Sequence, residues 1–334
     1  MRISLRAAHQ VKMMIPRLSR RSLLAVATLA LPVPVFAQTP RRLRVVTTTA
    51  MLADTVRMLA GEQVSVEALM GEGVDPHLYR PTRADIVKLT QADLVIAHGL
   101  GLEAQFRETF LQLARRRAPV LAAEAIARDQ LLKDAEVADK PDPHVWMDPK
   151  LWTVVVQAVS RALVAASPPG QPAIAPDLDP VMAKMNALGT YAGQVLSSVA
   201  AERRILVTAH DAFGYLARAY GFEVHGIQGL STESEAGLKA IEATVDLVVN
   251  RKLPAIFVES SVSDRNVRAV IEGAARRGHR VVVGAELFSD AMGKPGTYEG
   301  TYVGMIDHNV TAIARALGGT APEKGMSGRL GLTG

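Results

Sequence analysis

The chain contains no cysteine among its 334 residues. This absence excludes disulfide bonds, thiolate metal sites and cysteine nucleophiles, and we expect no lipid anchor, which would need an N-terminal cysteine. Aromatic side chains are also few, at 4% of residues, whereas 49% of residues are hydrophobic. Aliphatic side chains must therefore build most of a large core, and the length of the chain indicates about two domains.

Acidic side chains are absent from residues 1–37, which carry six Lys or Arg. The whole chain has 38 Lys and Arg against 33 Asp and Glu, a formal net charge of +5. Without the first 37 residues the two signs nearly balance. The remainder therefore has no basic excess of the kind that binds nucleic acid, and we expect no nucleic-acid partner.

Residues 1–37 have the pattern of an export signal. A basic start precedes an apolar run from Leu23 to Val35, and the small residue Ala37 ends the sequence "VFA". We predict cleavage near Ala37 and release into the periplasm. The apolar run is short for a membrane-spanning helix, although an N-terminal anchor is the alternative. "SRRSLLA" also resembles a twin-arginine export motif, so the general secretory route and the twin-arginine route both stay open.

Short aliphatic runs then alternate with longer amphipathic ones. "RLRVVTTT" predicts a buried strand, "AMLADTVRMLAG" predicts a helix ending at Gly61, and "APVLAAEA" predicts a later strand. Strands that alternate with helices in this way favour parallel sheets with crossover helices.

The middle of the chain breaks this alternation. A proline-rich segment from Ser167 to Pro180 precedes a long helical pattern with no strand beside it, a candidate connector. The strand, helix and terminal glycine then repeat, with Gly221 in the place of Gly61. We predict an α/β protein of two similar lobes, with parallel sheets flanked by helices, joined by a single long connecting helix. The predicted segments are the signal peptide 1–37, an N-terminal lobe 38–175, a connecting helix 176–202, a C-terminal lobe 203–319 and a flexible tail 320–334.

Three histidines occupy positions that are typical of ligand sites. Asp-Pro-His occurs twice, ending at His77 and His144. Each copy lies in a loop expected between a strand and a helix, where α/β folds bind ligands, and proline stiffens the loop. His210 ends "ILVTAH", the predicted first strand of the second lobe. The other histidines of the mature chain are His98, His225, His279 and His308. The patterns around them indicate turns, packing or solvent-exposed faces.

Three histidines from two lobes predict a metal in the cleft between them, because imidazole suits zinc, copper, iron or nickel. Without a thiolate, the fourth ligand should be a carboxylate. Position offers Glu259, Glu286 and Asp290, and spacing does not choose among them. Other carboxylates beside these histidines could orient an imidazole by accepting its second N–H. These are Asp75, Asp142, Asp148 and Asp211.

Several segments, from about Leu43 to Leu317, together resemble the zinc- and manganese-binding solute receptors of bacterial ABC importers. They are "DPHLYRPTRADIVKLTQADLVIAHGLGLE", "DPHVWMDP", "VTAHDAFGYLARAYG", "STESEAGLKAI", "FVESSVSDRN" and "LFSDAMGKPGTYEGTYVGM". The resemblance implies two lobes joined by one long, rather rigid helix and a metal buried between them. It implies four metal ligands, which are His77, His144, His210 and Asp290. Glu259 and Glu286 are therefore no longer candidates for the carboxylate ligand.

The resemblance also implies a function. The chain would be a monomeric periplasmic receptor, not an enzyme, that captures Zn²⁺ or Mn²⁺ and delivers it to a membrane ABC permease. Two features leave the metal open. Some manganese-binding members have Glu where this chain has His210, which favours zinc. Many dedicated zinc receptors have a histidine- and acid-rich loop between the first two ligands. The corresponding region of this chain, residues 114–140, contains no histidine, which lowers the odds of a dedicated zinc receptor.

The main alternative is an exported zinc hydrolase that uses the three histidines, with Glu259 as general base. The sequence contains no H-E-x-x-H motif. Catalytic zinc keeps an open position for water, so a fourth protein ligand at Asp290 would argue against this alternative. An adhesin is a further alternative, which no motif supports.

Overall fold

The computed structural model describes residues 41–134, 137, 139–167 and 173–331. The predicted signal peptide and its cleavage site near Ala37 lie outside the described residues. The helices and strands below all belong to the unit formed by residues 42–334. Within the described ranges, no helix combines the length and the apolar character that crossing a membrane requires.

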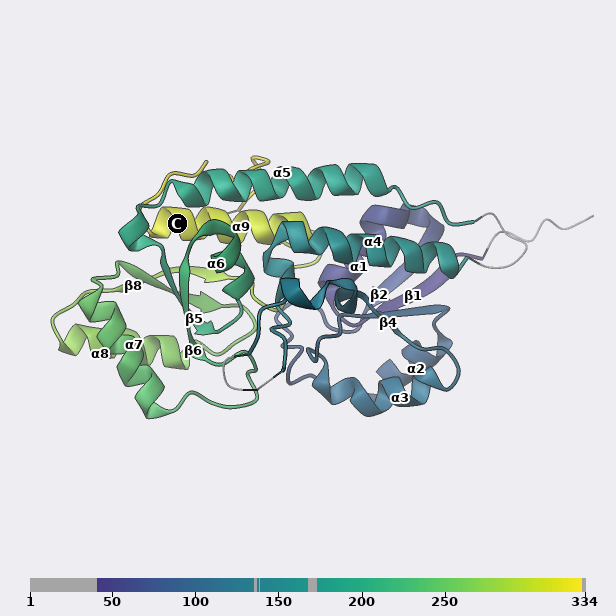
Figure 1. Cartoon of the computed structure of the whole chain (residues 1–334), viewed down its shortest axis with the longest axis horizontal. Helices are drawn as coiled ribbons and strands as arrows, with labels where there is room; N and C mark the ends of the chain where they lie inside the picture. Colours follow the sequence, from purple (N-terminus) through teal and green to yellow (C-terminus); the bar gives the residue numbers. More distant parts are fainter. Residues whose placement is uncertain (1–40, 135–136, 138, 168–172, 332–334) are drawn as a thin grey trace, which may run out of the picture. The chain divides into compact units, whose positions relative to one another are not determined.

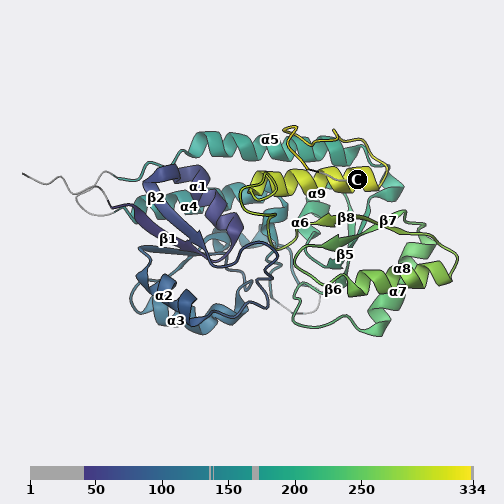
Figure 2. The same ribbon diagram turned by 180° about the vertical axis from the view of Figure 1, so that it is seen from behind.

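The first lobe is built on a parallel sheet with the strand order β2–β1–β3–β4. Its strands are β1 (Leu43–Thr47), β2 (Val64–Ala68), β3 (Leu94–Ala97) and β4 (Val120–Leu121). Its helices are α1 (Ala50–Ala60), α2 (Arg83–Gln91), α3 (Arg107–Ala114) and α4 (Pro149–Ala165). In Figures 1 and 2, α1 and α4 lie on one side of this sheet and α2 and α3 on the other. The carboxyl ends of the strands therefore meet at one edge, as in other open α/β sheets.

The second lobe contains two parallel strand pairs. β5 (Ile205–His210) pairs with β6 (Glu223–Gln228), and β7 (Ala255–Glu259) pairs with β8 (Val282–Leu287). β5 also lies beside β7, which brings the ends of these two strands together. The helices of this lobe are α6 (Gly214–Tyr220), α7 (Leu238–Asn250), α8 (Arg265–Arg276) and α9 (Tyr302–Ala316).

One long helix, α5 (Leu178–Ser197), joins the two lobes. It packs against α4 of the first lobe and α9 of the second, and Figure 1 shows it running along both. The predicted fold class, two α/β lobes with parallel sheets and a single long connecting helix, is confirmed. Gly61 and Gly221 both follow the last residue of a helix with positive φ, 48° and 72°, a conformation that glycine adopts without steric cost.

The scarce aromatic side chains include a group where the lobes meet. Trp152 of α4 stacks on Tyr302 of α9, with ring centroids 5.2 Å apart. The Tyr302 hydroxyl donates to the carbonyl of Trp146 at 2.8 Å, and the indole N–H of Trp146 donates to the carbonyl of Ser289 at 2.7 Å. All three aromatic side chains are fully buried. They fix the first lobe against the segment that follows β8.

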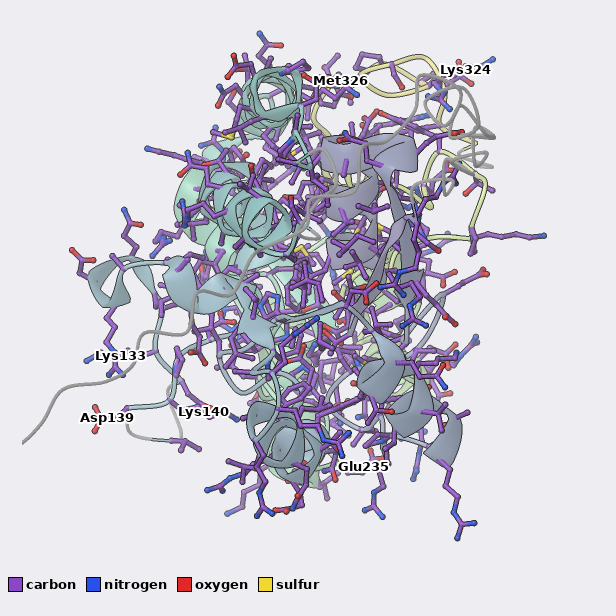
Figure 3. All side chains as sticks on the ribbon, turned by 90° about the vertical axis from the view of Figure 1, so that its right-hand side faces the viewer. Lys133, Asp139, Lys140, Glu235, Lys324 and Met326 are labelled. Carbon is purple, nitrogen blue, oxygen red and sulfur yellow. The ribbon has the colours of Figure 1, made fainter. Side chains whose placement is uncertain are left out.

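The structure corrects two local predictions. Only Val120–Leu121 of "APVLAAEA" forms a strand, and a short 3₁₀ helix follows at Ala122–Ala125. The predicted flexible tail packs against α9 over residues 320–331: Leu330 is 4% exposed, and the backbone N–H of Met326 donates to the buried carboxylate of Asp307 at 2.9 Å. Figure 3 shows this tail, labelled at Lys324 and Met326, at the same edge of the molecule as α5. Its small polar residues carried no local signal for these contacts.

Candidate metal centre

The two Asp-Pro-His loops share one local structure. Asp75 Oδ1 accepts the backbone N–H of His77 at 2.8 Å, and Asp142 Oδ1 accepts the backbone N–H of His144 at 2.9 Å. Aspartate forms such turns with the N–H two residues on, and the intervening proline fixes its own φ and has no N–H to compete. The repeated tripeptide is therefore a compact turn that holds the histidine backbone in a defined place.

His210 is held by a different device. It is the last residue of β5, and Glu259 is the last residue of the neighbouring strand β7. One oxygen of Glu259 accepts the backbone N–H of His210 at 2.9 Å, and the other lies 2.5 Å from its ring Nδ1. The carboxylate therefore fixes both the backbone and the ring, and Nε2 faces Asp290.

The four side chains that the sequence singles out converge between the lobes. Their potential ligand atoms all lie within 4.8 Å of one another. His77 Nε2 lies 3.3 Å from His144 Nε2, and the oxygens of Asp290 lie 3.5 Å from His144 Nε2 and 3.3 Å from His210 Nε2. Tetrahedral zinc with bonds of about 2.0–2.1 Å separates its ligands by about 3.3–3.4 Å. Three of the six separations are therefore close to those of a tetrahedral site, and all six are at most 4.8 Å.

All four side chains are buried, with exposed fractions of 5% or less. His210 Nε2 and both oxygens of Asp290 have no hydrogen-bond partner among the described residues. Burying a polar atom without a partner is costly, so such atoms are normally satisfied by protein, water or an ion. The arrangement has the features of a cation site: unpaired donor atoms, one negative charge and no access for a large ligand.

The electrostatics of the group show how its members affect one another. Burial lowers the pKa of His77 to about 3, so this imidazole is neutral at physiological pH. Burial also disfavours the charged form of His210, but the carboxylates of Glu259 and Asp290 outweigh it and raise the pKa of His210 well above its ordinary value. Burial acts to raise the pKa of Asp290, yet the imidazoles, His210 foremost, hold it below its ordinary value.

Of the four aspartates predicted to orient an imidazole, one does so. Asp142 Oδ1 lies 2.8 Å from His144 Nδ1. Asp75 contacts the backbone of His77, and Asp148 accepts the N–H of Lys150 at 2.8 Å as the N-cap of α4. Asp211 Oδ1 is buried, without a hydrogen-bond partner among the described residues. Orienting carboxylates fix the tautomer and raise the basicity of a ligand imidazole.

Sequence reasoning missed two residues that support the site. Glu259 was considered only as a ligand or a base, yet it orients His210. His98 was assigned to a plain turn, yet it is fully buried and its Nε2 lies 2.7 Å from the carbonyl of Pro143, next to His144. Glu259 is the last residue of β7 and His98 directly follows β3, and that position was the available signal. Their partners lie 49 and 45 residues away, beyond the reach of a local pattern.

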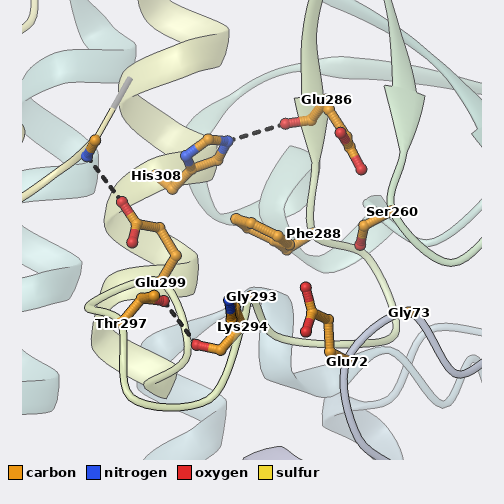
Figure 4. A pocket seen from close by; sticks show the side chains of 11 residues that line it. Glu72, Gly73, Ser260, Glu286, Phe288, Gly293, Lys294, Thr297, Glu299 and His308 are labelled. Atoms are coloured by element: carbon orange, nitrogen blue, oxygen red, sulfur yellow. Dashed lines mark hydrogen bonds between the residues drawn. The ribbon is translucent and has the colours of Figure 1, made fainter. Parts of the chain in front are cut away.

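Glu286, the other carboxylate candidate, lies outside the four-residue group. It lines a separate pocket of about 500 Å³ together with Glu72, Glu299 and His308. Figure 4 shows this pocket, with the ring of His308 hydrogen-bonded to the carbonyl of Glu286. The ring nitrogens of His225 and His279 contact the carboxylate of Glu223 and the carbonyl of Leu253. None of these histidines belongs to the cluster.

Comparison with known proteins identifies the family. The family model described as "Zinc-uptake complex component A periplasmic" matches residues 45–316. The chain belongs to this family. The match extends over both lobes and the connecting helix and includes all four clustered side chains.

Individual members of the family are similar over most of their length. The chain is 46% identical over 273 residues to the zinc-binding protein TroA of Treponema pallidum, covering 82% of this chain and 88% of that protein. It is 39% identical to the manganese-binding lipoprotein MntA of Bacillus subtilis, covering 83% and 90%. A solved structure of periplasmic zinc-binding protein TroA from Treponema pallidum superimposes with a TM-score of 0.78 at 45% identity, covering 83% of this chain and 99% of that one.

Proposed function

We propose that this chain captures a divalent transition metal between its lobes and delivers it to a membrane ABC permease. One observation carries the proposal: four buried side chains, two from each lobe, bring their potential ligand atoms within 4.8 Å of one another, and those of His210 and Asp290 have no hydrogen-bond partner among the described residues. Membership of a family described as a periplasmic component of a zinc-uptake complex supports capture for uptake. The metal is the cargo of the protein and has no resident role.

The proposed ligands are the Nε2 atoms of the histidines and the carboxylate of the aspartate. Three neutral imidazoles and one carboxylate suit zinc in a tetrahedral site. Manganese favours more oxygen, which both oxygens of one carboxylate would supply. Among the relatives, one is named for zinc and another for manganese, so both ions are candidates. The proposed ligand set is His77, His144, His210 and Asp290.

The remaining parts of the proposal concern the form of the protein. We propose a monomer that is exported, cleaved near Ala37 and free in the periplasm without a lipid anchor. We place the lobes at residues 38–175 and 203–319, on either side of a connector at 176–202. Mass spectrometry of the protein purified from periplasm tests the cleavage site and the anchor together, since a lipid would add its own mass.

The hydrolase alternative has no support in the comparisons, which identify a family of uptake components. The geometry also disfavours it. Both oxygens of Glu259 are engaged with His210, so this carboxylate is poorly placed to act as a general base. With Asp290 as the proposed fourth ligand, no position would remain for the water that a catalytic zinc keeps. We therefore propose a receptor without enzymatic activity.

A competition titration of the metal-free mature protein with Zn²⁺ and Mn²⁺, joined to metal analysis of protein taken from cells, tests the proposal. We expect one ion per chain and the same ion in the purified protein. A chain that binds neither ion with a stoichiometry of about one would contradict the proposal, since a closed four-ligand site holds a single ion.

A further inference from the structure

Residues 229–237, within which "STESEAG" lies, have no part in the site described so far. We call them the β6–α7 loop. The loop starts after Gln228, the last residue of β6, which pairs with His210 across the two parallel strands. The side-chain amide of Gln228 donates to the carbonyl of Ser234 at 3.0 Å. The loop thus leaves the sheet beside one proposed ligand and is anchored to the second lobe.

The same loop reaches across to the first lobe. The hydroxyl of Thr232 donates to Asp75 Oδ2 at 2.6 Å, and Glu233 accepts from the side-chain amide of Gln105 at 2.8 Å. Thr232 is 8% exposed. The other oxygen of Asp75 accepts the backbone N–H of His77. One carboxylate therefore links a hydroxyl of the second lobe to the backbone of a proposed ligand in the first.

The β6–α7 loop lies on the side of the molecule away from the connecting helix α5. Figure 3 labels Glu235, a loop residue, at the edge of the molecule opposite α5. Figures 1 and 2 likewise show the chain between β6 and α7 on the side away from α5. The bond between Thr232 and Asp75 joins the two lobes, so separating the lobes on this side requires that it break.

We propose that Thr232 is a positioning residue and a latch: its bond to Asp75 closes the lobes and holds His77 in its binding position. The inference rests on the proposed function and adds the residue pair that sets how long the cargo stays bound. A hydrogen bond to a charged acceptor is worth enough that its loss changes an equilibrium or a rate about 10-fold or more. Release of metal should therefore respond to the Thr232 hydroxyl even though Thr232 touches no ligand atom.

Three substitutions separate the latch from ordinary packing. Thr232→Val removes the hydroxyl and keeps the shape, whereas Thr232→Ser keeps the hydroxyl. Thr244→Val is the matched control: Thr244 is also 8% exposed, lies in the same lobe, and its hydroxyl donates within α7 to the carbonyl of Ala240 at 2.8 Å. Stopped flow monitors the release of Zn²⁺ from the metal-loaded mature protein into excess chelator. It gives the dissociation rate of each variant.

We expect Thr232→Val to release Zn²⁺ about 10-fold faster or more than the unsubstituted protein, with Thr232→Ser and Thr244→Val within about 3-fold. Equal rates for the unsubstituted protein and Thr232→Val overturn the proposal. So does equal acceleration by Thr244→Val, since that pattern reports general loosening of the lobe.

A second readout does not depend on metal. Amide hydrogen exchange in the metal-free protein reports the His77 N–H, which Asp75 accepts, and the amides of the β6–α7 loop. We expect faster exchange at both places in Thr232→Val and unchanged exchange there in Thr244→Val. If the unsubstituted protein bound no metal, the proposed function would fail, and this comparison alone would decide the latch. Unchanged exchange at His77 in Thr232→Val overturns it.

Discussion

Asp290 is the one carboxylate among the four converging side chains, and neither of its oxygens has a hydrogen-bond partner among the described residues. Asp290→Ala should weaken metal binding by more than about 100-fold, because a lost ligand costs more than the 10–100-fold typical of an orienting partner. The dissociation constant from competition titration measures the loss. Glu286→Ala is the control. Glu286 lies in β8, three residues after Val283, and is outside the cluster, so this variant should bind metal like the unsubstituted protein. An Asp290→Ala variant with unchanged affinity would remove this residue from the site.

Glu259 contacts His210 and lies outside the group of four side chains, so we expect it to act on a bound metal only through His210. Glu259→Gln keeps an oxygen for the backbone N–H of His210 but lacks the charge that orients the ring through Nδ1. We expect an affinity about 10–100-fold lower, with one ion per chain retained. The same titration measures both values. If the affinity fell no further than in a Glu286→Gln control, the orienting role would be refuted.

The pH dependence of binding follows from His210. Its raised pKa means that the metal-free protein holds a proton on this imidazole near neutral pH, so a metal must displace it. The groups that face His210 are the carboxylates of Glu259 and Asp290 and the rings of His77 and His144. The affinity should fall as the pH falls, by about 10–100-fold between pH 7.5 and 5.5. Titration calorimetry in buffers of different ionisation enthalpy should show proton release. Equal affinity at both pH values would contradict this expectation.

At the scale of the elements, the sequence predicted the positions of the candidate ligands better than the contacts that hold those side chains in place. The two Asp-Pro-His turns are local, because each aspartate contacts the N–H two residues on, and the sequence therefore displays them. His210 ends a strand, which periodicity also reveals. The ligand roles themselves stay a proposal. The contact of Glu259 with His210 depends on two strands lying side by side, which no local pattern encodes.

The C-terminal segment is the element that sequence reasoning judged wrongly. Its composition is small and polar, but Leu330 is 4% exposed, and the buried Asp307 accepts the N–H of Met326. Leu330→Ala should lower the free energy of unfolding by about 2–4 kcal/mol, the usual cost of truncating a buried leucine. Urea denaturation measures it, with the exposed Lys324→Ala as control. Equal stability of the two variants would show that the segment does not pack in solution.

At the scale of the whole molecule, alternating strands and helices, one proline-rich break and one unpaired helix were enough to predict two lobes and a connector. That pattern could not reveal how the lobes touch. The contact of Thr232 with Asp75 joins residues 157 apart, and that of Trp146 with Ser289 joins residues 143 apart. Such contacts depend on how the two lobes pack against each other. They also decide what release requires, because moving the lobes apart separates two proposed ligands from the other two.

The central claim is that four side chains from two lobes hold one metal ion, and anomalous diffraction from crystals of the metal-loaded mature protein tests it most directly. With Zn²⁺ we expect one anomalous peak between the lobes, with ligand atoms of all four side chains about 2.0–2.2 Å away. Those side chains are His77, His144, His210 and Asp290. A peak elsewhere, or an ion here with water in place of the Asp290 carboxylate, would contradict the claim.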